Sequence, residues 1–235
     1  MPDADPHVLV PFDAHRPKSR LADTLDESER RAFATTMLED VLAALDRAGL
    51  ERTVLSTAPL DDAPDRDVPV IVDDRPLTTA VNARLAGDLV GAAEPPVPAH
   101  ERPVAVVMAD LPLVTPGALG RLVAADGDGP RPDVTMAPGL GGGTNALCVR
   151  DPAFRVDYHG ASCHDHREGA RDRGLSVATV DSFRLAVDVD ERADLVEILL
   201  HGEGTGTRAW LRAAGFELAA GEGRVRVARR SDERA

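Results

Sequence analysis

The chain has 235 residues, of which 43% are hydrophobic and 3% aromatic, and its formal net charge is −13 at pH 7. This length suits one large domain or two small ones, and the acidic balance disfavours nucleic acid as a partner, because a phosphate backbone needs a basic face. No apolar run approaches the ~20 residues of a membrane span, and the acidic amino terminus has no signal-peptide pattern, so we expect a soluble, cytoplasmic protein.

Arginine supplies almost all of the positive charge, and lysine occurs once, at position 18. Many acidic residues, arginine in place of lysine and few aromatics are typical of halophilic proteins, whose acidic surface maintains solubility at molar salt. A GC-rich genome also favours arginine, so an ordinary acidic protein is the alternative interpretation. Cys148 and Cys163 are the two cysteines, too few for a disulfide framework.

Strand and helix patterns alternate along most of the chain. We expect strands at 8–12, 53–57, 68–72, 104–109, 133–137 and 176–180, and a further strand entered from a glycine loop within 139–147. We expect helices at 26–48, from 73 to about 89, and at 115–125, 162–174 and 191–200. Loops are expected at 59–69 and 94–103, and a terminal hairpin at 221–229.

The first helix has the clearest local signals. Phe33 and Met37 fall on one face at helical spacing, within a longer apolar series. Asp26 with Glu29 matches a capping box at the start of the helix. Gly49 suits the position just beyond its end.

Alternating strands and helices predict an α/β fold, with an open, mostly parallel sheet covered by helices on both faces. The chain shows no internal repeat, and we predict a single domain over residues 1–235, with a C-terminal arm at about 202–235. Sheets of this kind bind ligands just beyond the carboxyl ends of their strands. The residues that follow each strand are therefore the first candidates for a site.

The candidates at these strand ends are cationic, acidic and glycine-rich. They are Lys18 with Arg20, Asp73 with Asp74, Asp110, the loop 141–145, and Asp188 with Asp190. Hard Mg²⁺ takes one or two carboxylates together with phosphate oxygens and waters. The simplest ligand for such a set is a polyphosphate with magnesium.

Lys18 lies in the segment PFDAHRPKSRL, between the first strand and the first helix. A lysine ammonium is a compact point charge that suits a phosphate whose charge moves during a reaction. Strand, basic loop and helix is also the usual order for phosphate binding. The alternative is a cationic loop that lies beside an acidic surface.

Structural roles stay open for the other candidates. Asp110 is also a candidate helix cap or turn residue, and Asp190 a candidate cap for the helix at 191. The glycine loop offers N–H groups to an anion, and is otherwise a plain hairpin turn. Ser162 either caps the helix that it begins or binds an anion there.

Two other kinds of site are disfavoured. Cys163, His164 and His166 are residue types that ligate zinc, but no second ligand pair lies at zinc spacing elsewhere. A serine nucleophile is also disfavoured, because the chain has no G-x-S-x-G elbow.

Several motifs in order give the chain a family resemblance. These are PFDAHRPKSRL at 11–21, ADLPL at 109–113, GGGTNAL at 141–147, YHGASCHDH at 158–166 and LAVDVDERADL at 185–195. Together they resemble the 2-phospho-L-lactate guanylyltransferase family, which makes a precursor of the deazaflavin coenzyme F-420. The resemblance covers about residues 8–215. It implies the three-layer α/β/α fold of the nucleotidyltransferases that make sugar nucleotides.

The resemblance implies a reaction and a nucleotide site. GTP and 2-phospho-L-lactate would give lactyl-diphospho-guanosine and pyrophosphate. Lys18 and Arg20 would hold the GTP phosphates, Pro11 would line the nucleotide site, and Asn82 matches a nucleoside-contacting asparagine of the family. Lys18, Asp110 and Asp188 would be the catalytic residues.

The resemblance also implies a metal site and an acid site. Asp110, which would also contact the nucleotide, and Asp188 would carry Mg²⁺ together with Asp190. Asp188 and Asp190 are two residues apart, so in an extended segment both carboxylates point to one side. The phosphorylated acid would be held by Thr144, Gly160 and Ser162.

Four positions depart from the family, and the assembly is implied only by it. The family often has a lysine where Asp13 stands and an aromatic residue where Cys163 stands, and its usual glycine and leucine beside Asn82 are Ala80 and Val81 here. A homodimer is expected, with the region after Gly202 as a candidate contact.

Three rival interpretations remain. The nearest is another nucleotidyltransferase of this fold, acting on phosphoenolpyruvate or a sugar phosphate or using another base. The second is a magnesium phosphohydrolase with Asp188 or Asp190 as the nucleophile. The third is a regulatory domain that binds GTP without releasing pyrophosphate.

Overall fold

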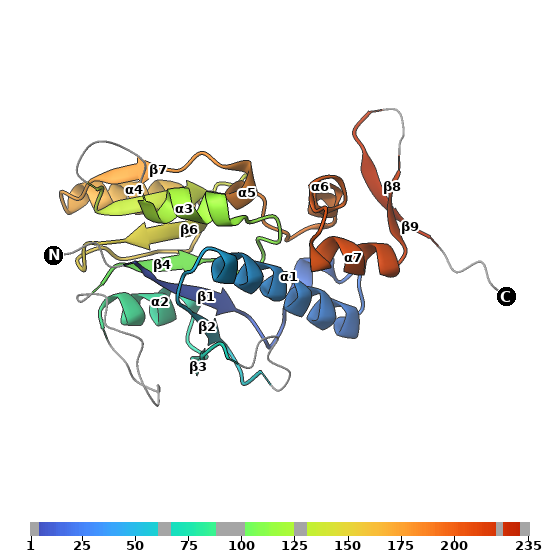
Figure 1. Ribbon diagram of the computed structural model, residues 1–235, viewed down its shortest axis with the longest axis horizontal. Helices are drawn as coiled ribbons and strands as arrows, with labels where there is room; N and C mark the ends of the chain where they lie inside the picture. Colours follow the sequence, from blue (N-terminus) through green and yellow to red (C-terminus); the bar gives the residue numbers. More distant parts are fainter. Residues whose placement is uncertain (1–4, 61–66, 88–101, 125–130, 220–222, 231–235) are drawn as a thin grey trace.

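The computed structural model describes residues 5–60, 67–87, 102–124, 131–219 and 223–230. Seven strands form one sheet in the order β3-β2-β1-β4-β6-β5-β7, and two more form a separate hairpin (Figure 1). The hairpin and the last helices lie at one end of the molecule, away from the sheet. The expected loops at 59–69 and 94–103 fall mostly outside the described residues.

The strands and helices follow the expected alternation. The strands are β1 (His7–Phe12), β2 (Arg52–Ser56), β3 (Val70–Val72), β4 (Val104–Val107), β5 (Val134–Pro138), β6 (Thr144–Val149), β7 (Val177–Thr179), β8 (Phe216–Ala219) and β9 (Arg226–Arg229). The α-helices are α1 (Glu27–Arg47), α2 (Leu77–Leu85), α3 (Pro116–Ala124), α4 (Ser162–Asp172), α5 (Phe183–Ala186), α6 (Leu195–His201) and α7 (Gly206–Ala213). Two 3₁₀ turns, η1 (Ser19–Leu21) and η2 (Arg192–Asp194), complete the described elements.

The sheet is mostly parallel, as predicted. β1 pairs in parallel with β2 and β4, β2 with β3, and β5 with β7, whereas β6 runs antiparallel to β4 and β5. All six residues of β1 are buried, as its continuous apolar run indicates. The carboxyl ends of β1 and β4 therefore meet at one edge of the sheet.

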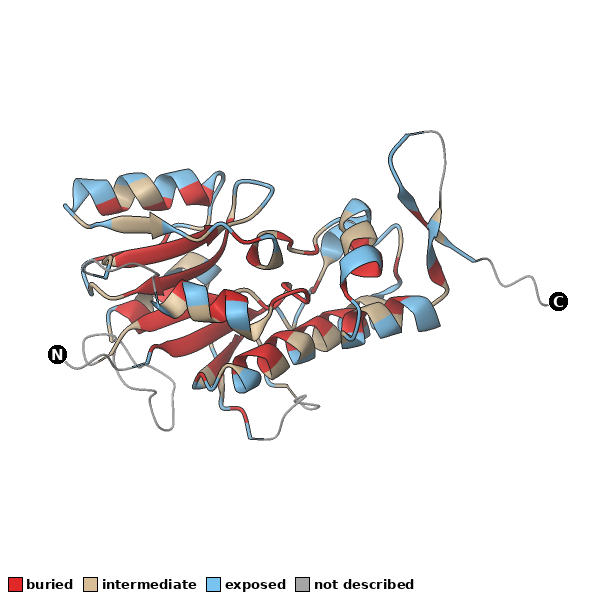
Figure 2. Ribbon diagram, turned by 45° about the horizontal axis from the view of Figure 1, so that its top comes forward, coloured by how far each residue is buried: buried red, intermediate tan, exposed pale blue. Residues whose placement is uncertain are grey.

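Two apolar clusters lie on opposite faces of the sheet. One contains buried residues of α1, α3, α6 and α7 and includes Val8 and Val10 of β1. The other contains residues of α2 and α4 and includes Leu9 of the same strand. Figure 2 shows the buried residues concentrated on the strands and on one side of α1. The fold is thus a three-layer α/β/α arrangement.

The local signals of α1 are confirmed. The Asp26 carboxylate accepts from the backbone N–H of Glu29, and the Glu29 carboxylate accepts from the N–H of Asp26. Gly49 has φ of +70°, the left-handed conformation that follows many helix ends. This helix begins just after the basic loop and so helps to fix where the loop ends.

Some boundaries were wrong. α2 begins at Leu77, because Pro76 adopts an extended ψ of 142° as its N-cap. The strand expected at 104–109 ends at Val107. The helix expected at 191–200 starts with the 3₁₀ turn η2 and continues as α6 to His201.

The sequence patterns missed two helices and half of the hairpin. α5 has four residues and α7 has eight, too short for a convincing periodic signal. α7 is held instead by Asp40 of α1, whose carboxylate accepts from the backbone N–H groups of Gly206 and Thr207. The hairpin is real, but its first strand is β8, so it begins before the expected residue 221.

No helix in the described part of the chain is long and apolar enough to span a membrane.

α7 packs on α1, where the rings of Phe33 and Trp210 have centroids 5.0 Å apart. The single-domain organisation remains a prediction.

We predict that Phe33→Ala lowers the free energy of unfolding by about 3–5 kcal/mol, because it opens a cavity at a fully buried side chain. Guanidinium denaturation of the full chain measures this loss. Arg31→Ala, on the exposed side of the same helix, is the control and changes the free energy by less than about 0.5 kcal/mol. Equal losses in the two variants would contradict the packing of α1 described above.

Candidate active site

A cavity of about 330 Å³ opens at the carboxyl ends of β1 and β4. It is lined by the basic loop, part of α1 and acidic side chains, namely Pro11, Phe12, Asp13, Arg16, Pro17, Lys18, Ser19, Arg20, Ala34, Met37, Met108, Ala109, Asp110 and Asp190. The structure therefore brings together five of the predicted site residues: Pro11, Lys18, Arg20, Asp110 and Asp190. The cavity lies at the carboxyl ends of the strands, where a sheet of this kind is expected to bind its ligands.

The basic loop is shaped by an aspartate and a strained lysine. The Asp13 carboxylate accepts from the backbone N–H groups of His15 and Arg16 and from the Thr57 hydroxyl, so it folds the loop on itself. Lys18 has φ of +52°, and it is the one described residue other than glycine with a positive φ. Non-glycine residues in this region cost free energy and cluster at functional sites.

The Lys18 ammonium lies between two carboxylates. Its Nζ donates to Asp110 Oδ2 at 2.6 Å and to Asp190 Oδ1 at 2.8 Å, and Arg20 donates to Asp190 Oδ2 at 3.2 Å. Burial by itself would lower the pKa of Lys18, but the charges and hydrogen bonds of Asp110 and Asp190 outweigh it and raise that pKa. Burial likewise opposes ionisation of Asp190, yet Lys18 and Arg20 leave its pKa below the ordinary value.

The contacts of Asp110 and Asp190 bear on the capping roles left open for them. Asp190 is not the cap of the next helical turn, because Glu191 is the N-cap and shares a capping box with Asp194. Asp110 caps no helix in the described residues either, since its carboxylate bonds Lys18. The cationic loop contacts these two carboxylates, and its binding of phosphate remains a prediction.

Two carboxyl groups in the site keep acceptor capacity. The Oδ1 atom of Asp110 is buried and has no hydrogen-bond partner among the described residues. Asp188 is not among the residues that line the cavity, and its Oδ1 accepts from the Asn145 amide at 3.1 Å. Burial and the charges of Asp110 and Asp190 raise the pKa of Asp188, against the lowering effect of the Asn145 hydrogen bond.

The donor set suits a hard cation, although the ligands are not preassembled. No group of three or more acidic, histidine or cysteine side chains in the described residues is close enough together to hold a metal ion. Lys18 holds Asp110 and Asp190 in this structure. An unpartnered buried carboxylate oxygen at Asp110 nevertheless leaves one oxygen for Mg²⁺, which prefers such ligands.

Two of the three residues predicted to hold the acid, Thr144 and Ser162, belong to a buried network outside this cavity, whereas Gly160 is exposed. Ser162 Oγ accepts from the N–H of Thr144 at 2.9 Å, and the Thr144 hydroxyl bonds His166 Nδ1 at 2.9 Å. Gly160, with φ of +58°, lies just before helix α4. These residues do not line the 330 Å³ cavity.

His166, which the sequence analysis weighed only as a zinc ligand, is a structural member of this network. Its Nε2 accepts from the N–H of Asp157 at 2.8 Å, so both ring nitrogens are occupied. Burial lowers the pKa of His166 to about 4, which keeps the ring neutral near pH 7. With both nitrogens engaged, the ring is no zinc ligand in this structure.

Two further candidates have structural partners. The amide of Asn82 bonds both the carbonyl and the N–H of Val156, each at 2.8 Å, so its contact with a nucleoside remains a prediction. Asp73 pairs with Arg75 and Arg84. It is therefore an ion-pair residue in this structure rather than an available carboxylate at the strand end.

The glycine loop is a hairpin turn between β5 and β6. Gly139 N–H donates to the Gly143 carbonyl at 2.9 Å, and Gly142 N–H to the Gly139 carbonyl at 3.1 Å. Gly142 has φ of +84°, which favours glycine. The plain-turn alternative thus accounts for the backbone of this loop.

Comparisons with solved structures identify the fold. A nucleotidyl transferase from Methanothermobacter thermautotroptrophicus is 15% identical, with a TM-score of 0.56 over 89% of this chain and 99% of that one. A 4-diphosphocytidyl-2C-methyl-D-erythritol synthase has a TM-score of 0.52 at 13% identity, over 84% of this chain and 99% of that one. The fold is that of the nucleotidyltransferases.

Sequence comparison identifies the family. The family model described as "Guanylyl transferase CofC like" matches residues 6–230. The 2-phospho-L-lactate guanylyltransferase of Halomicrobium mukohataei is 55% identical over 222 residues, which is 94% of this chain and 98% of the relative. That of Natronomonas pharaonis is 53% identical over 223 residues, 95% and 98% of the two chains. The chain belongs to this guanylyltransferase family and is a nucleotidyltransferase.

We predict that Lys18→Met lowers the free energy of unfolding at pH 7 by about 1–3 kcal/mol. This is less than for a fully buried pair, because the Asp190 side chain is 40% exposed. The depressed pKa of Asp190 means that its stabilising contribution is present above pH 3.8, its ordinary pKa, and is lost as pH falls through the folded-state value. The difference between variant and wild type should therefore shrink as the pH falls below 3.8 and through the lowered folded-state pKa of Asp190.

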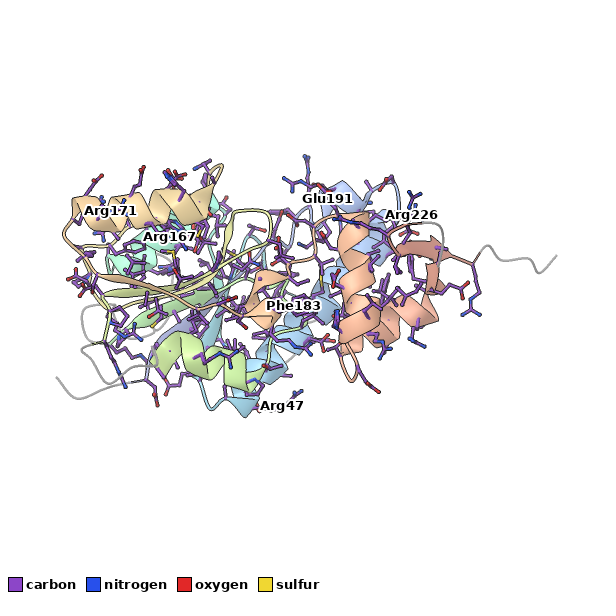
Figure 3. All side chains as sticks on the ribbon, turned by 90° about the horizontal axis from the view of Figure 1, so that it is seen from above. Arg47, Arg167, Arg171, Phe183, Glu191 and Arg226 are labelled. Atoms are coloured by element: carbon purple, nitrogen blue, oxygen red, sulfur yellow. The ribbon has the colours of Figure 1, made fainter. Side chains whose placement is uncertain are left out.

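Denaturation at pH 7 and pH 3 in the same salt measures this difference. Arg171→Met is the control, because Arg171 lies on α4 at the opposite end of the molecule from the C-terminal helices (Figure 3). A loss that is equal at both pH values would show that the ion pairs do not carry the stabilisation.

Proposed function

We propose that the protein transfers GMP from GTP to 2-phospho-L-lactate, which gives lactyl-diphospho-guanosine and pyrophosphate on the path to coenzyme F-420. The observation that carries this is near-full-length identity above 50% to relatives named 2-phospho-L-lactate guanylyltransferase. The site supports it, because a cavity at the strand ends combines Lys18 and Arg20 with paired carboxylates.

The chemistry needs no general base. The attacking group is a phosphate oxygen of phospholactate, which is already anionic at neutral pH. The barrier is repulsion between anions and the growth of charge on the leaving pyrophosphate. Lys18 and Arg20 offset that charge and, with Pro11 lining the site, hold the nucleotide in line for attack.

Asp110 and Asp188 are the residues that would hold magnesium. The unpartnered Oδ1 of Asp110 and the half-buried carboxyl of Asp188 support this role. When bound, Mg²⁺ would neutralise charge on the phosphate oxygens. Asp190 would complete the group once Lys18 turns toward a phosphate, since the two cations that hold it now are the ones assigned to GTP.

Thr144, Gly160 and Ser162 would hold the phosphorylated acid, and Asn82 would contact the nucleoside. The hydrogen bonds among Thr144, Ser162 and His166 support a rigid platform for this group. The same proposal includes a cytoplasmic homodimer, and a halophilic setting consistent with the net charge of −13.

The nearest alternative is a related nucleotidyltransferase that acts on phosphoenolpyruvate. It would use the same cations and carboxylates, because the two acids share a phosphate and a carboxylate. A phosphohydrolase with Asp188 or Asp190 as nucleophile is less well supported, because it leaves Lys18 without a part in the reaction. A GTP-sensing domain would bind the nucleotide without releasing pyrophosphate.

We predict pyrophosphate release, in high salt with magnesium, for GTP paired with 2-phospho-L-lactate. ATP, CTP and UTP should release none above background with the same acid. Phosphoenolpyruvate in place of phospholactate is the control for the acid. Release with phosphoenolpyruvate alone would identify that acid as the substrate in place of phospholactate. Binding of GTP with no release from any pair would favour the sensing domain.

We predict that Asp110→Ala lowers turnover by at least about 100-fold, because it removes a carboxylate that would hold magnesium beside the reacting phosphates.

We predict that Lys18→Ala mainly lowers kcat, by about 10²–10³-fold, since the leaving-group charge grows in the transition state. Steady-state kinetics with varied GTP separates the two parameters, and Arg171→Ala serves as the control. A rise in KM without loss of kcat would mean that Lys18 binds substrate and transition state equally.

A further inference from the structure

Asn145 links the two carboxylate segments of the site and has no part in the function proposed so far. It is the second residue of β6 and is 5% exposed. Its side-chain nitrogen donates to the Leu185 carbonyl at 3.0 Å and to Asp188 Oδ1 at 3.1 Å. Its own carbonyl accepts from the N–H of Met108 at 3.0 Å, two residues before Asp110. One residue thus connects the end of β4 with the Asp188 segment.

The Asp188 carboxylate depends on this amide for its orientation. Among the described residues, the Asn145 amide is the side-chain group that hydrogen-bonds it. Asp188 lies in a segment that runs between the sheet and the C-terminal helices, with Phe183 and Glu191 at its ends (Figure 3). The amide holds this segment at two points, the carbonyl of Leu185 and the carboxylate of Asp188.

An amide is the group that suits this position. Its nitrogen donates two hydrogen bonds and carries no charge, and here it meets two acceptors. An aspartate would place a like charge against Asp188. An alanine would leave the buried carbonyl of Leu185 without the Asn145 donor and the Asp188 carboxylate free to turn.

Gly139 leaves the space that this amide occupies. A Cβ atom at position 139 would lie 2.4 Å from Asn145 Oδ1 and 2.9 Å from its Cγ, far inside van der Waals contact. Any larger residue would therefore push the Asn145 side chain away from its acceptors. Gly139 itself lies in the β5–β6 turn, where its N–H bonds Gly143.

We infer that Asn145 is a positioning residue that aims the Asp188 carboxylate at the magnesium ion, and that Gly139 is required to keep the Asn145 amide in place. The inference rests on the proposed function in that Asp188 is taken as a magnesium ligand. Groups that hydrogen-bond a metal ligand typically change metal affinity by about 10–100-fold when they are removed.

The experiment measures binding of Mn²⁺ alone to the full chain by calorimetry, in enough KCl to suppress binding to the acidic surface. The variants are Asn145→Ala, Gly139→Ala and the double variant. Asn145→Ala should weaken Mn²⁺ binding by about 10–100-fold, and Gly139→Ala should weaken it in the same way. The double variant should be no weaker than Asn145→Ala, because alanine at 145 has no amide for the new Cβ to displace.

Thr53→Val is the matched control. Thr53 lies on β2, away from the carboxylates, and the substitution removes its buried hydrogen bond of 2.8 Å to His7 of β1. Its Mn²⁺ affinity should equal that of the wild type. A thermal melt of each variant measures its loss of stability. The loss of Mn²⁺ binding in a variant is then compared with that of the control at a similar loss of stability.

Unchanged Mn²⁺ affinity in Asn145→Ala, or additive losses in the double variant, would overturn the inference. If Asn145→Ala does not fold, Gly139→Ala decides, and wild-type affinity there would also overturn it. Pyrophosphate release by the wild type is measured separately. Weakened Mn²⁺ binding in a protein that releases no pyrophosphate would support the positioning role while refuting the assigned reaction.

Discussion

The Lys18 ammonium between Asp110 and Asp190 is the interaction on which the site depends. A lysine charge withdrawn from water is costly unless carboxylates compensate it. The two partners here lie 92 and 172 residues away in sequence. The fold must therefore hold the ends of β1 and β4 and the segment after α5 together. The left-handed backbone at Lys18 is the local cost of that arrangement.

In the proposed function, this arrangement would let an acidic protein bind an anionic nucleotide. The net charge of −13 repels a triphosphate at long range, but salt screens distant charges much more than close ones. Lys18 and Arg20 are already desolvated or paired at the cavity, so a phosphate would exchange for a carboxylate partner. Each carboxylate released in that exchange becomes a candidate ligand for magnesium.

The surroundings of the site act through orientation rather than charge. Asp13 folds the basic loop by accepting from its backbone and from Thr57. Asn145 holds Asp188, with Gly139 leaving the space. α7 packs on α1 and so supports the helix that follows the loop. In the proposed function, these residues would act without contacting a substrate.

The sequence by itself determined the layered α/β fold, the capping box of α1, and the collection of Lys18, Arg20, Asp110 and Asp190 at the strand ends. Those features depend on local periodicity and on a rule about parallel sheets. Tertiary structure decided the rest, because side-chain partners distant in sequence leave no local pattern. It paired Asp73 with arginines, buried Thr144 and Ser162 beside His166, and placed the Asn145 amide against Asp188. The short helix α7 was missed for the same reason, since Asp40 of α1 holds its first turn.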